Sequence, residues 1–171
     1  MENNMHTPVF TMTTEKMLQL SVEEHTSVLA RLWRKRKGHV YVQGETGTGK
    51  TTVARYVATQ LKADFFSYEL LSPEAFKAEQ ADIIAHLAAS RKKVLILDGF
   101  FPQHASHAFS TLLRELREQG VSLFIFSQES LVPGSPQRHD DLNVSPDAFT
   151  TIAEFRYASR ERHAVTLHQA K

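Results

Sequence analysis

The sequence predicts an α/β fold in which a mainly parallel central sheet lies between two layers of helices and ends in a C-terminal β-hairpin. Three observations carry this prediction. Short apolar runs of strand length alternate with amphipathic helical stretches between residues 21 and 128. A glycine-rich loop joins one apolar run to the next helix, and two alternating segments, 151–157 and 163–168, close the chain. Strands that alternate with helices favour parallel pairing and a sheet that is covered on both faces.

The composition is that of one globular domain. The chain has 171 residues, of which 42% are hydrophobic and 23% are charged, and its formal net charge is +1. So small a net charge gives no global attraction to nucleic acid or to a membrane surface. Cysteine is absent, which excludes disulfides and cysteine-ligated metals and fits a cytoplasmic location. We expect a flexible, polar N-terminal arm over 1–20, a single domain over 21–171 and no transmembrane segment.

The first helix is predicted from Ser21 to about Lys37. Ser21 and Glu24 have the spacing of a capping box, in which each side chain satisfies a backbone N–H of the first turn. The basic run 34–37 and then Gly38 follow the apolar stripe, and cations and glycine are common where a helix ends. The same run is also a candidate patch for nucleic acid or another acidic partner, and the sequence leaves both interpretations open.

The stretch from Gly44 to Thr51, GETGTGKT, fits the phosphate-binding pattern G-x-x-x-x-G-K-[ST] without departure. A short apolar strand over 39–43 precedes it, and a helix over 52–61 follows. The glycines let backbone N–H groups turn inward around a polyphosphate, and the helix N-terminus adds partial positive charge. Lys50 can then reach the β- and γ-phosphates, while the Thr51 hydroxyl can ligate Mg²⁺. The predicted nucleotide-binding residues are Gly44, Glu45, Thr46, Gly47, Thr48, Gly49, Lys50, Thr51 and Thr52.

Strand, glycine loop and helix together resemble the P-loop NTPase superfamily. The resemblance implies a three-layer P-loop NTPase fold that binds a nucleoside triphosphate with Mg²⁺. No Asn/Thr-Lys-x-Asp motif for guanine is present, which favours ATP over GTP. Further along, we expect strands over 64–69, 94–98 and 121–126, helices over 72–89 and 105–119, and a proline-rich loop over 132–146.

The strand that ends at Asp98, VLILD, has the form of a Walker B segment. The carboxyl ends of parallel strands meet at one end of a sheet, so Asp98 should lie beside the P-loop and hold Mg²⁺ together with Thr51. The alternative is an aspartate that merely ends the strand in an Asp-Gly turn.

Many P-loop ATPases carry a glutamate immediately after this aspartate, where the present chain has Gly99. The glycine counts against the AAA+ family, as does the short sequence that follows the core. We therefore expect the general base to come from Glu69, at the end of a second strand that should lie beside the P-loop strand. The RecA/KaiC-like branch places its catalytic glutamate there, and residues 68–74 and the closing hairpin resemble that branch. The alternative role for Glu69 is a solvated residue at a helix entry.

Gln128 follows the strand that begins near Leu123 and could contact the γ-phosphate and report its presence. Residues 114–128 resemble the conjugative coupling proteins and Zot-like ATPases at this point. Candidate residues for reaching a neighbouring subunit's γ-phosphate are Arg138, Arg156, Arg160 and Arg162.

Taken together, these features predict a MgATP-binding ATPase core that works as a motor or switch subunit in a homo- or hetero-oligomer or a larger assembly. One alternative is a nucleotide-binding adaptor that does not hydrolyse ATP, which Gly99 favours. A second is a small-molecule kinase whose lid would be the loop over 132–146. The sequence leaves nucleic acid open as a partner.

Overall fold

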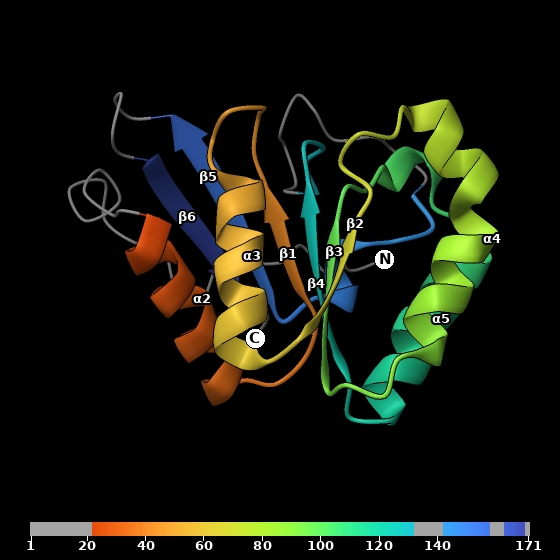
Figure 1. Cartoon of the computed structure of the whole chain (residues 1–171), viewed down its shortest axis with the longest axis horizontal. Coiled ribbons are helices and arrows are strands. Elements are labelled where there is room, and N and C mark those ends of the chain that lie inside the picture. Colours follow the sequence, from red (N-terminus) through yellow and green to blue (C-terminus); the bar gives the residue numbers. More distant parts are fainter. Residues whose placement is uncertain (1–21, 132–141, 158–162, 170–171) are drawn as a thin grey trace, which may run out of the picture.

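The computed structural model describes residues 22–131, 142–157 and 163–169 (Figure 1). The helices are α2 (Val22–Lys35), α3 (Lys50–Leu61), α4 (Pro73–Ala89) and α5 (His107–Glu118), and two 3-10 turns are η1 (Pro102–His104) and η2 (Pro146–Ala148). The strands are β1 (Val40–Gln43), β2 (Asp64–Ser67), β3 (Val94–Asp98), β4 (Ser122–Ser127), β5 (Thr151–Tyr157) and β6 (His163–Gln169). The predicted arm over 1–20 and the cap at Ser21 lie outside the described residues.

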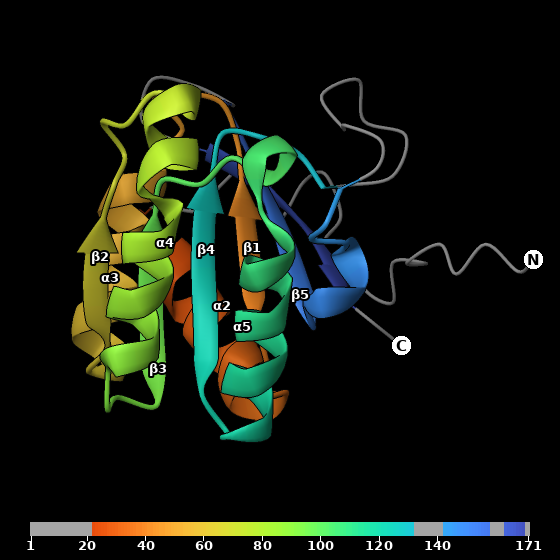
Figure 2. The ribbon, with the colours of Figure 1, turned by 90° about the vertical axis from the view of Figure 1, so that its right-hand side faces the viewer.

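The six strands form one sheet in the order β2-β3-β4-β1-β5-β6. Strands β1 to β5 are parallel to one another, and β6 pairs antiparallel with β5 as the second strand of a terminal hairpin. Helices α2 and α3 lie against one face of the sheet and α4 and α5 against the other (Figures 1 and 2). The predicted three-layer α/β fold with a C-terminal hairpin is confirmed.

The expected position of the second strand is wrong. The expected neighbour of this strand is the P-loop strand, but β2 lies at the outer edge of the sheet, with β3 and β4 between it and β1. Burial explains the difference, because β1 is fully buried while the sequence of β2, DFFS, is only half-buried. A strand that keeps a partly solvated backbone suits an edge, and the central position goes to the strand that is apolar on both faces.

Two hydrophobic clusters hold the three layers together, one on each face of the sheet. Alternate residues of β3 supply both, since Leu95 and Leu97 pack toward α4 and α5 while Val94 and Ile96 pack toward α2 and α3. This two-residue alternation is what a strand buried on both faces requires. None of the helices in the described part of the chain has the length and apolar character needed to cross a bilayer.

His39, immediately before β1, joins three elements of the core. Its ring is 1% exposed. The backbone N–H of Leu123 donates to Nδ1 at 3.0 Å, and Nε2 therefore carries the proton that it donates to the Leu113 carbonyl at 2.6 Å. Burial lowers the pKa of His39 from 6.5 to about 4, with the nearby Arg117 adding to the effect and the bond to Leu113 opposing it. The folded protein thus holds this histidine neutral.

We predict that His39 makes the fold sensitive to mild acid. The unfolded chain takes up this proton below pH 6.5 and the folded chain only near pH 4, so stability is lost as the pH falls between these values. Between pH 7.5 and 4.5 the free energy of unfolding should fall by roughly 2–3 kcal/mol more in the wild type than in His39→Asn. Urea unfolding at both pH values measures this, with the same change at exposed His107 as the control. An equal fall in wild type and His39→Asn would contradict the assignment.

Candidate nucleotide site

The glycine loop takes the form that anion binding needs. Gly47 and Gly49 both have φ of +85°, in the left-handed region that side chains disfavour. Gly49 is the N-cap of α3, and the first turn of this helix has neither a side-chain cap nor an acidic residue. The N–H groups of that turn therefore face the loop without an internal acceptor, and they carry the positive end of the helix dipole.

Lys50 lies inside the loop rather than in the hydrophobic core. Its ammonium donates to the Glu45 carbonyl oxygen at 2.8 Å and lies 3.4 Å from the Thr48 hydroxyl. Burial lowers the pKa of Lys50 to about 8, and the nearby Asp98 and Glu45 carboxylates offset part of that effect. Because burial disfavours the charged form of Lys50, a polyphosphate placed against the ammonium would stabilise that form.

Asp98 ends β3 directly opposite the loop and is 3% exposed. Its Oδ2 atom is buried and accepts no hydrogen bond. Burial raises the pKa of Asp98, and the Glu69 carboxylate adds to this, while the Thr51 hydroxyl and Lys50 lower it. Mg²⁺ is usually held by only one or two protein oxygens, with phosphate and water as the other ligands. An unpartnered carboxylate oxygen beside a threonine hydroxyl meets this requirement.

Glu69 reaches this site from the edge strand. It lies two residues beyond the end of β2, and the Thr51 hydroxyl donates to its Oε2 at 2.6 Å. The structure thus brings Glu69, Thr51 and Asp98 to one cavity of about 380 Å³ above the P-loop. The cavity is lined by Thr46, Gly47, Gly49, Lys50, Thr51, Thr52, Glu69, Leu70, Asp98, Gly99, Phe100, Phe101, Phe126, Ser127 and Gln128.

The glycine at position 99 has a steric explanation that the sequence does not reveal. A Cβ at this position would lie 2.5 Å from the backbone of Tyr68 and 2.7 Å from the Glu69 nitrogen, and φ is +103°. The Tyr68 N–H donates to the Asp98 carbonyl oxygen at 2.7 Å, which continues the pairing of β2 with β3. Position 99 therefore cannot carry a side chain, because the segment that delivers Glu69 occupies that space.

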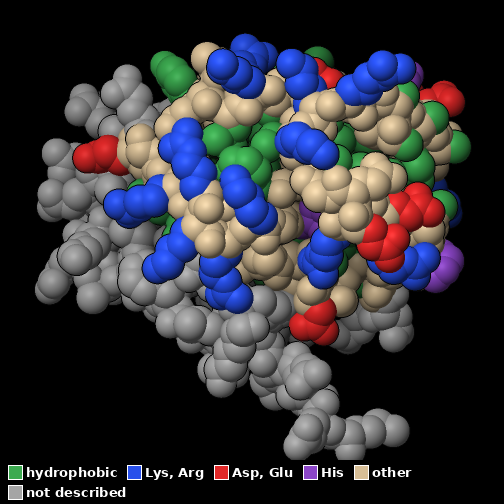
Figure 3. All heavy atoms as spheres, turned by 90° about the horizontal axis from the view of Figure 1, so that it is seen from below, with side chains coloured by type: hydrophobic (Ala, Val, Ile, Leu, Met, Phe, Trp, Pro, Cys, Tyr) green, Lys and Arg blue, Asp and Glu red, His purple; other side chains and the backbone are tan. Residues whose placement is uncertain are grey.

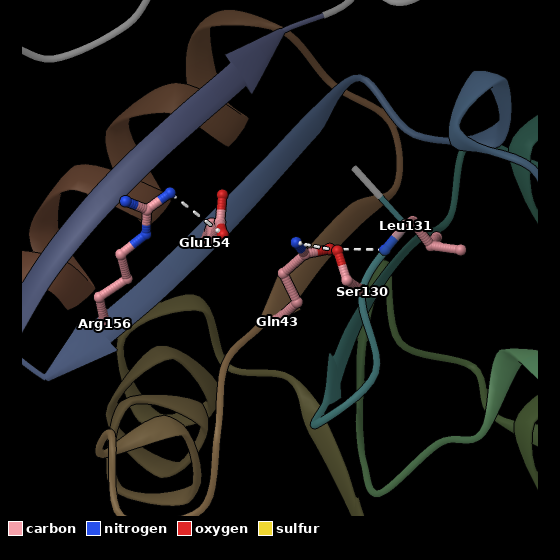
Figure 4. A network of polar contacts seen from close by, with 5 residues as sticks. All are labelled: Gln43, Ser130, Leu131, Glu154 and Arg156. Atoms are coloured by element: carbon pink, nitrogen blue, oxygen red, sulfur yellow. Dashed lines mark hydrogen bonds and ion pairs between the residues drawn. The ribbon is translucent and has the colours of Figure 1, made fainter. Parts of the chain in front are cut away.

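Gln128 follows β4, which lies between β1 and β3, so its exposed side chain borders the cavity between the P-loop and Asp98. Two side chains of β1 hold the segment after it. Tyr41 donates from its hydroxyl to the Glu129 carbonyl oxygen at 2.8 Å. Gln43 donates to the Ser130 hydroxyl at 2.7 Å and accepts from the Leu131 N–H at 2.8 Å (Figure 4).

Sequence reasoning missed the role of Gln43. Its side chain is 2% exposed, and its amide nitrogen and oxygen both have hydrogen-bond partners in the segment after β4. One feature of the sequence could have indicated it, namely an amide residue that ends an otherwise apolar strand directly before a glycine loop. Of the candidate arginines, Arg156 pairs with Glu154 on β5 at 3.3 Å (Figure 4) and does not line the cavity. The others, Arg138, Arg160 and Arg162, lie outside the described residues.

A parallel sheet with its glycine loop at the carboxyl end of β1 and a buried aspartate at the end of β3 defines a P-loop NTPase. A family model described as "AAA domain" matches residues 33–132, which is more than half of the chain. The chain belongs to this family and is an AAA-type P-loop ATPase domain. Gly99 counted against the AAA+ family in the sequence, yet the match runs through this position, so the glycine is compatible with membership.

Three solved structures are among those to which the chain is similar. RuvB from Thermotoga maritima is 20% identical over 85% of this chain and 46% of its own, with a TM-score of 0.49. PCH-2 from C. elegans is 16% identical over 78% and 40%, with a TM-score of 0.46. Pif1 from Bacteroides sp is 16% identical over 64% and 33%, with a TM-score of 0.39. The chain spans less than half the length of each, and no curated protein sequence matches it.

We predict that Gly99→Ala destabilises the protein by about 2–4 kcal/mol, because the methyl group meets backbone atoms and the residue must keep a positive φ. Gly120→Ala is the matched control. Gly120 also has a positive φ, +73°, but a Cβ there would have no neighbour within 4 Å. Gly120→Ala should therefore lower the free energy of unfolding by only about 1 kcal/mol, which is the contribution of the backbone conformation alone. Chemical denaturation of both variants measures the difference, and equal losses would show that the contact at position 99 relaxes freely.

Proposed function

We propose that this protein is a MgATP-hydrolysing subunit that works as a motor or switch within an oligomer or larger assembly. The observation that supports hydrolysis best is the hydrogen bond between Thr51 and Glu69. It holds a carboxylate over the P-loop, next to the aspartate after which many P-loop ATPases carry their catalytic glutamate. The oligomeric assembly and a cytoplasmic location are part of the proposal and rest on the sequence.

Binding of the triphosphate would fall to the loop from Gly44 to Thr52. In this proposal its N–H groups and Lys50 surround the phosphates, and Lys50 gives up its bond to the Glu45 carbonyl oxygen for a phosphate oxygen. Thr51 and Asp98 would hold Mg²⁺, which neutralises phosphate charge when it is bound. The described residues contain no group of three or more His, Asp or Glu that could hold a metal. Phosphate and water oxygens would thus complete the ligand set.

Water activation would fall to Glu69. The Thr51 hydroxyl fixes the orientation of the carboxylate, which can then accept a proton from a water placed for attack on the γ-phosphate. Gln128 would contact the γ-phosphate. This contact would couple the presence of the γ-phosphate to β4 and to the segment that Tyr41 and Gln43 anchor. A glutamate supplied from the end of β2 agrees with the RecA/KaiC-like resemblance, and that branch assignment remains a prediction.

The Thr51–Glu69 contact also supports a second function, a nucleotide-dependent adaptor with little turnover. In that case Glu69 would orient Thr51 toward Mg²⁺ and would not act as a base. The kinase alternative rests on a lid over 132–146, of which residues 132–141 lie outside the described part.

We predict that Asp98→Asn weakens MgATP binding by about 10- to 100-fold and changes Mg²⁺-free ATP binding by less than about threefold. The lost charge acts mainly through the ion. Because burial raises the pKa of Asp98, neutralising it should not lower the free energy of unfolding. Calorimetric titration with and without Mg²⁺ measures both affinities, with exposed Asp82→Asn on α4 as the control. Equal losses under the two conditions would assign Asp98 a structural role.

The test of hydrolysis is Glu69→Gln, because glutamine can still accept the Thr51 hydrogen bond but cannot take a proton. We expect single-turnover hydrolysis to slow by about 10²–10⁴-fold with MgATP affinity nearly unchanged. Glu74→Gln, an exposed carboxylate in the first turn of α4, should behave like the wild type.

A Glu69→Gln variant that hydrolyses ATP normally would remove Glu69 as the base. If Glu69→Ala then weakened only Mg²⁺-dependent binding, the adaptor function would be favoured. Absence of turnover in the wild type would favour it as well.

A further inference from the structure

Cations gather where the helices return to the sheet. In a parallel sheet the segments that enter the strands all lie at the amino end, opposite the P-loop. Three of these connections, before β1, β2 and β3, carry exposed Lys or Arg. Figure 3 views the molecule from this end and shows many basic side chains and few acidic ones. The exposed members, which we call the basic face, are Arg34, Lys35, Lys37, Lys62, Arg91, Lys92 and Lys93.

Helix capping accounts for only part of the basic face. Arg34 and Lys35 lie in the last turn of α2 and Lys62 is the C-cap of α3, where cations complement the helix dipole. Lys37 and the run 91–93 lie beyond the ends of α2 and α4, although Lys93 donates to the carbonyl oxygen of Gln119, the C-cap of α5, at 3.4 Å. Among the entry segments, the carboxylate of Asp64 accepts a 2.5 Å hydrogen bond from the Ser90 hydroxyl and does not pair with this run. The cations therefore form a local excess in a chain whose net charge is +1.

The spacing of the basic face suits a rigid array of phosphates. The entry to β1 and the entry to β2 are three strand positions apart, which is about 14 Å at the usual strand separation. A DNA duplex presents a phosphate charge every ~1.7 Å along its axis, on both sides of grooves about 6 and 12 Å wide. Cations spread over this distance can contact both strands of one duplex.

Figure 3 shows apolar side chains between the cations of this end, but few large apolar side chains of the described residues are strongly exposed, which argues against two other anionic partners. Single-stranded nucleic acid is usually held by exposed aromatic rings that stack on bases, and membrane surfaces by apolar side chains that insert. The large exposed apolar side chains in the described ranges are Tyr56 on α3 and Leu70 at the carboxyl end of the sheet. Trp33 is half-buried, and the Lys37 ammonium lies 3.4 Å from its ring centroid.

We propose that the basic face binds the phosphate backbone of duplex DNA without reading its sequence. The duplex would lie at the amino end of the sheet, so it and a nucleotide at the P-loop could be bound together. The proposal does not require ATP hydrolysis, and it can fail while the proposed function holds.

The test measures binding of the full chain to a fluorescent mixed-sequence duplex of about 20 base pairs by anisotropy at several salt concentrations. With about four phosphates contacted, the logarithm of the association constant should fall against the logarithm of salt with a slope of about −3.6. Lys35→Glu and Lys92→Glu should each weaken binding about tenfold and make the slope shallower by about one. Lys77→Glu is the matched control, an exposed lysine near the other end of α4, and it should bind like the wild type.

ATP turnover should be unchanged in all three variants, because none of these lysines lines the nucleotide cavity. Three results would each overturn the proposal. One is no duplex binding at about 50 mM salt, and another is an equal affinity and slope in wild type and face variants. The third is a preference for single-stranded DNA or for anionic lipid vesicles over the duplex.

Discussion

The contact between the Tyr68–Glu69 backbone and Gly99 is the constraint on which the nucleotide site depends. It leaves no room for a Cβ after Asp98, and it brings a carboxylate from an edge strand to within hydrogen-bonding distance of Thr51. The two features are one arrangement, because a bulkier residue at 99 would displace the segment that carries Glu69. A glycine that looks like the loss of a catalytic residue in the sequence is thus the condition for placing another carboxylate at the same cavity.

Burial of opposite charges explains why the site suits a charged ligand. Desolvation lowers the pKa of Lys50 and raises the pKa of Asp98, so each group is held where its charged form is disfavoured. The ammonium rests on a backbone carbonyl, and one carboxylate oxygen of Asp98 has no hydrogen-bond partner. A polyphosphate with a divalent cation would offer both groups a stronger counter-charge than the protein does, and the stability given up to bury them would be recovered as binding.

Local sequence patterns predicted the helices and strands well, but they predicted poorly which strands and side chains lie next to each other in the fold. The alternation of strand and helix, the loop from Gly44 to Thr51 and the position of Asp98 at the end of its strand all follow from residues that are close in sequence. The position of β2 does not, because strand order depends on the competition of all strands for the centre of the sheet. The bonds of His39 and Gln43 were missed for the same reason. Their partners lie 74 to 88 residues away, and nothing local marks a polar side chain as one that will be buried and paired.

Charge is likewise hard to interpret from the sequence, because the composition gives only the net charge and not where the charged residues lie in the fold. A net charge of +1 predicts no attraction to polyanions, but the fold separates the charges that make up this sum. The connections that enter strands hold the lysines and arginines of the basic face, whereas Glu45, Glu69 and Asp98 lie at the carboxyl end. Parallel topology causes this separation, since it sends every helix-to-strand connection to one end and every strand-to-helix connection to the other. Two ends with different sets of charged groups then coexist in a nearly neutral chain, and each could recognise a phosphate ligand by different means. At the carboxyl end the groups are backbone N–H groups, one buried lysine and carboxylates suited to a cation, and at the amino end they are solvated side-chain cations.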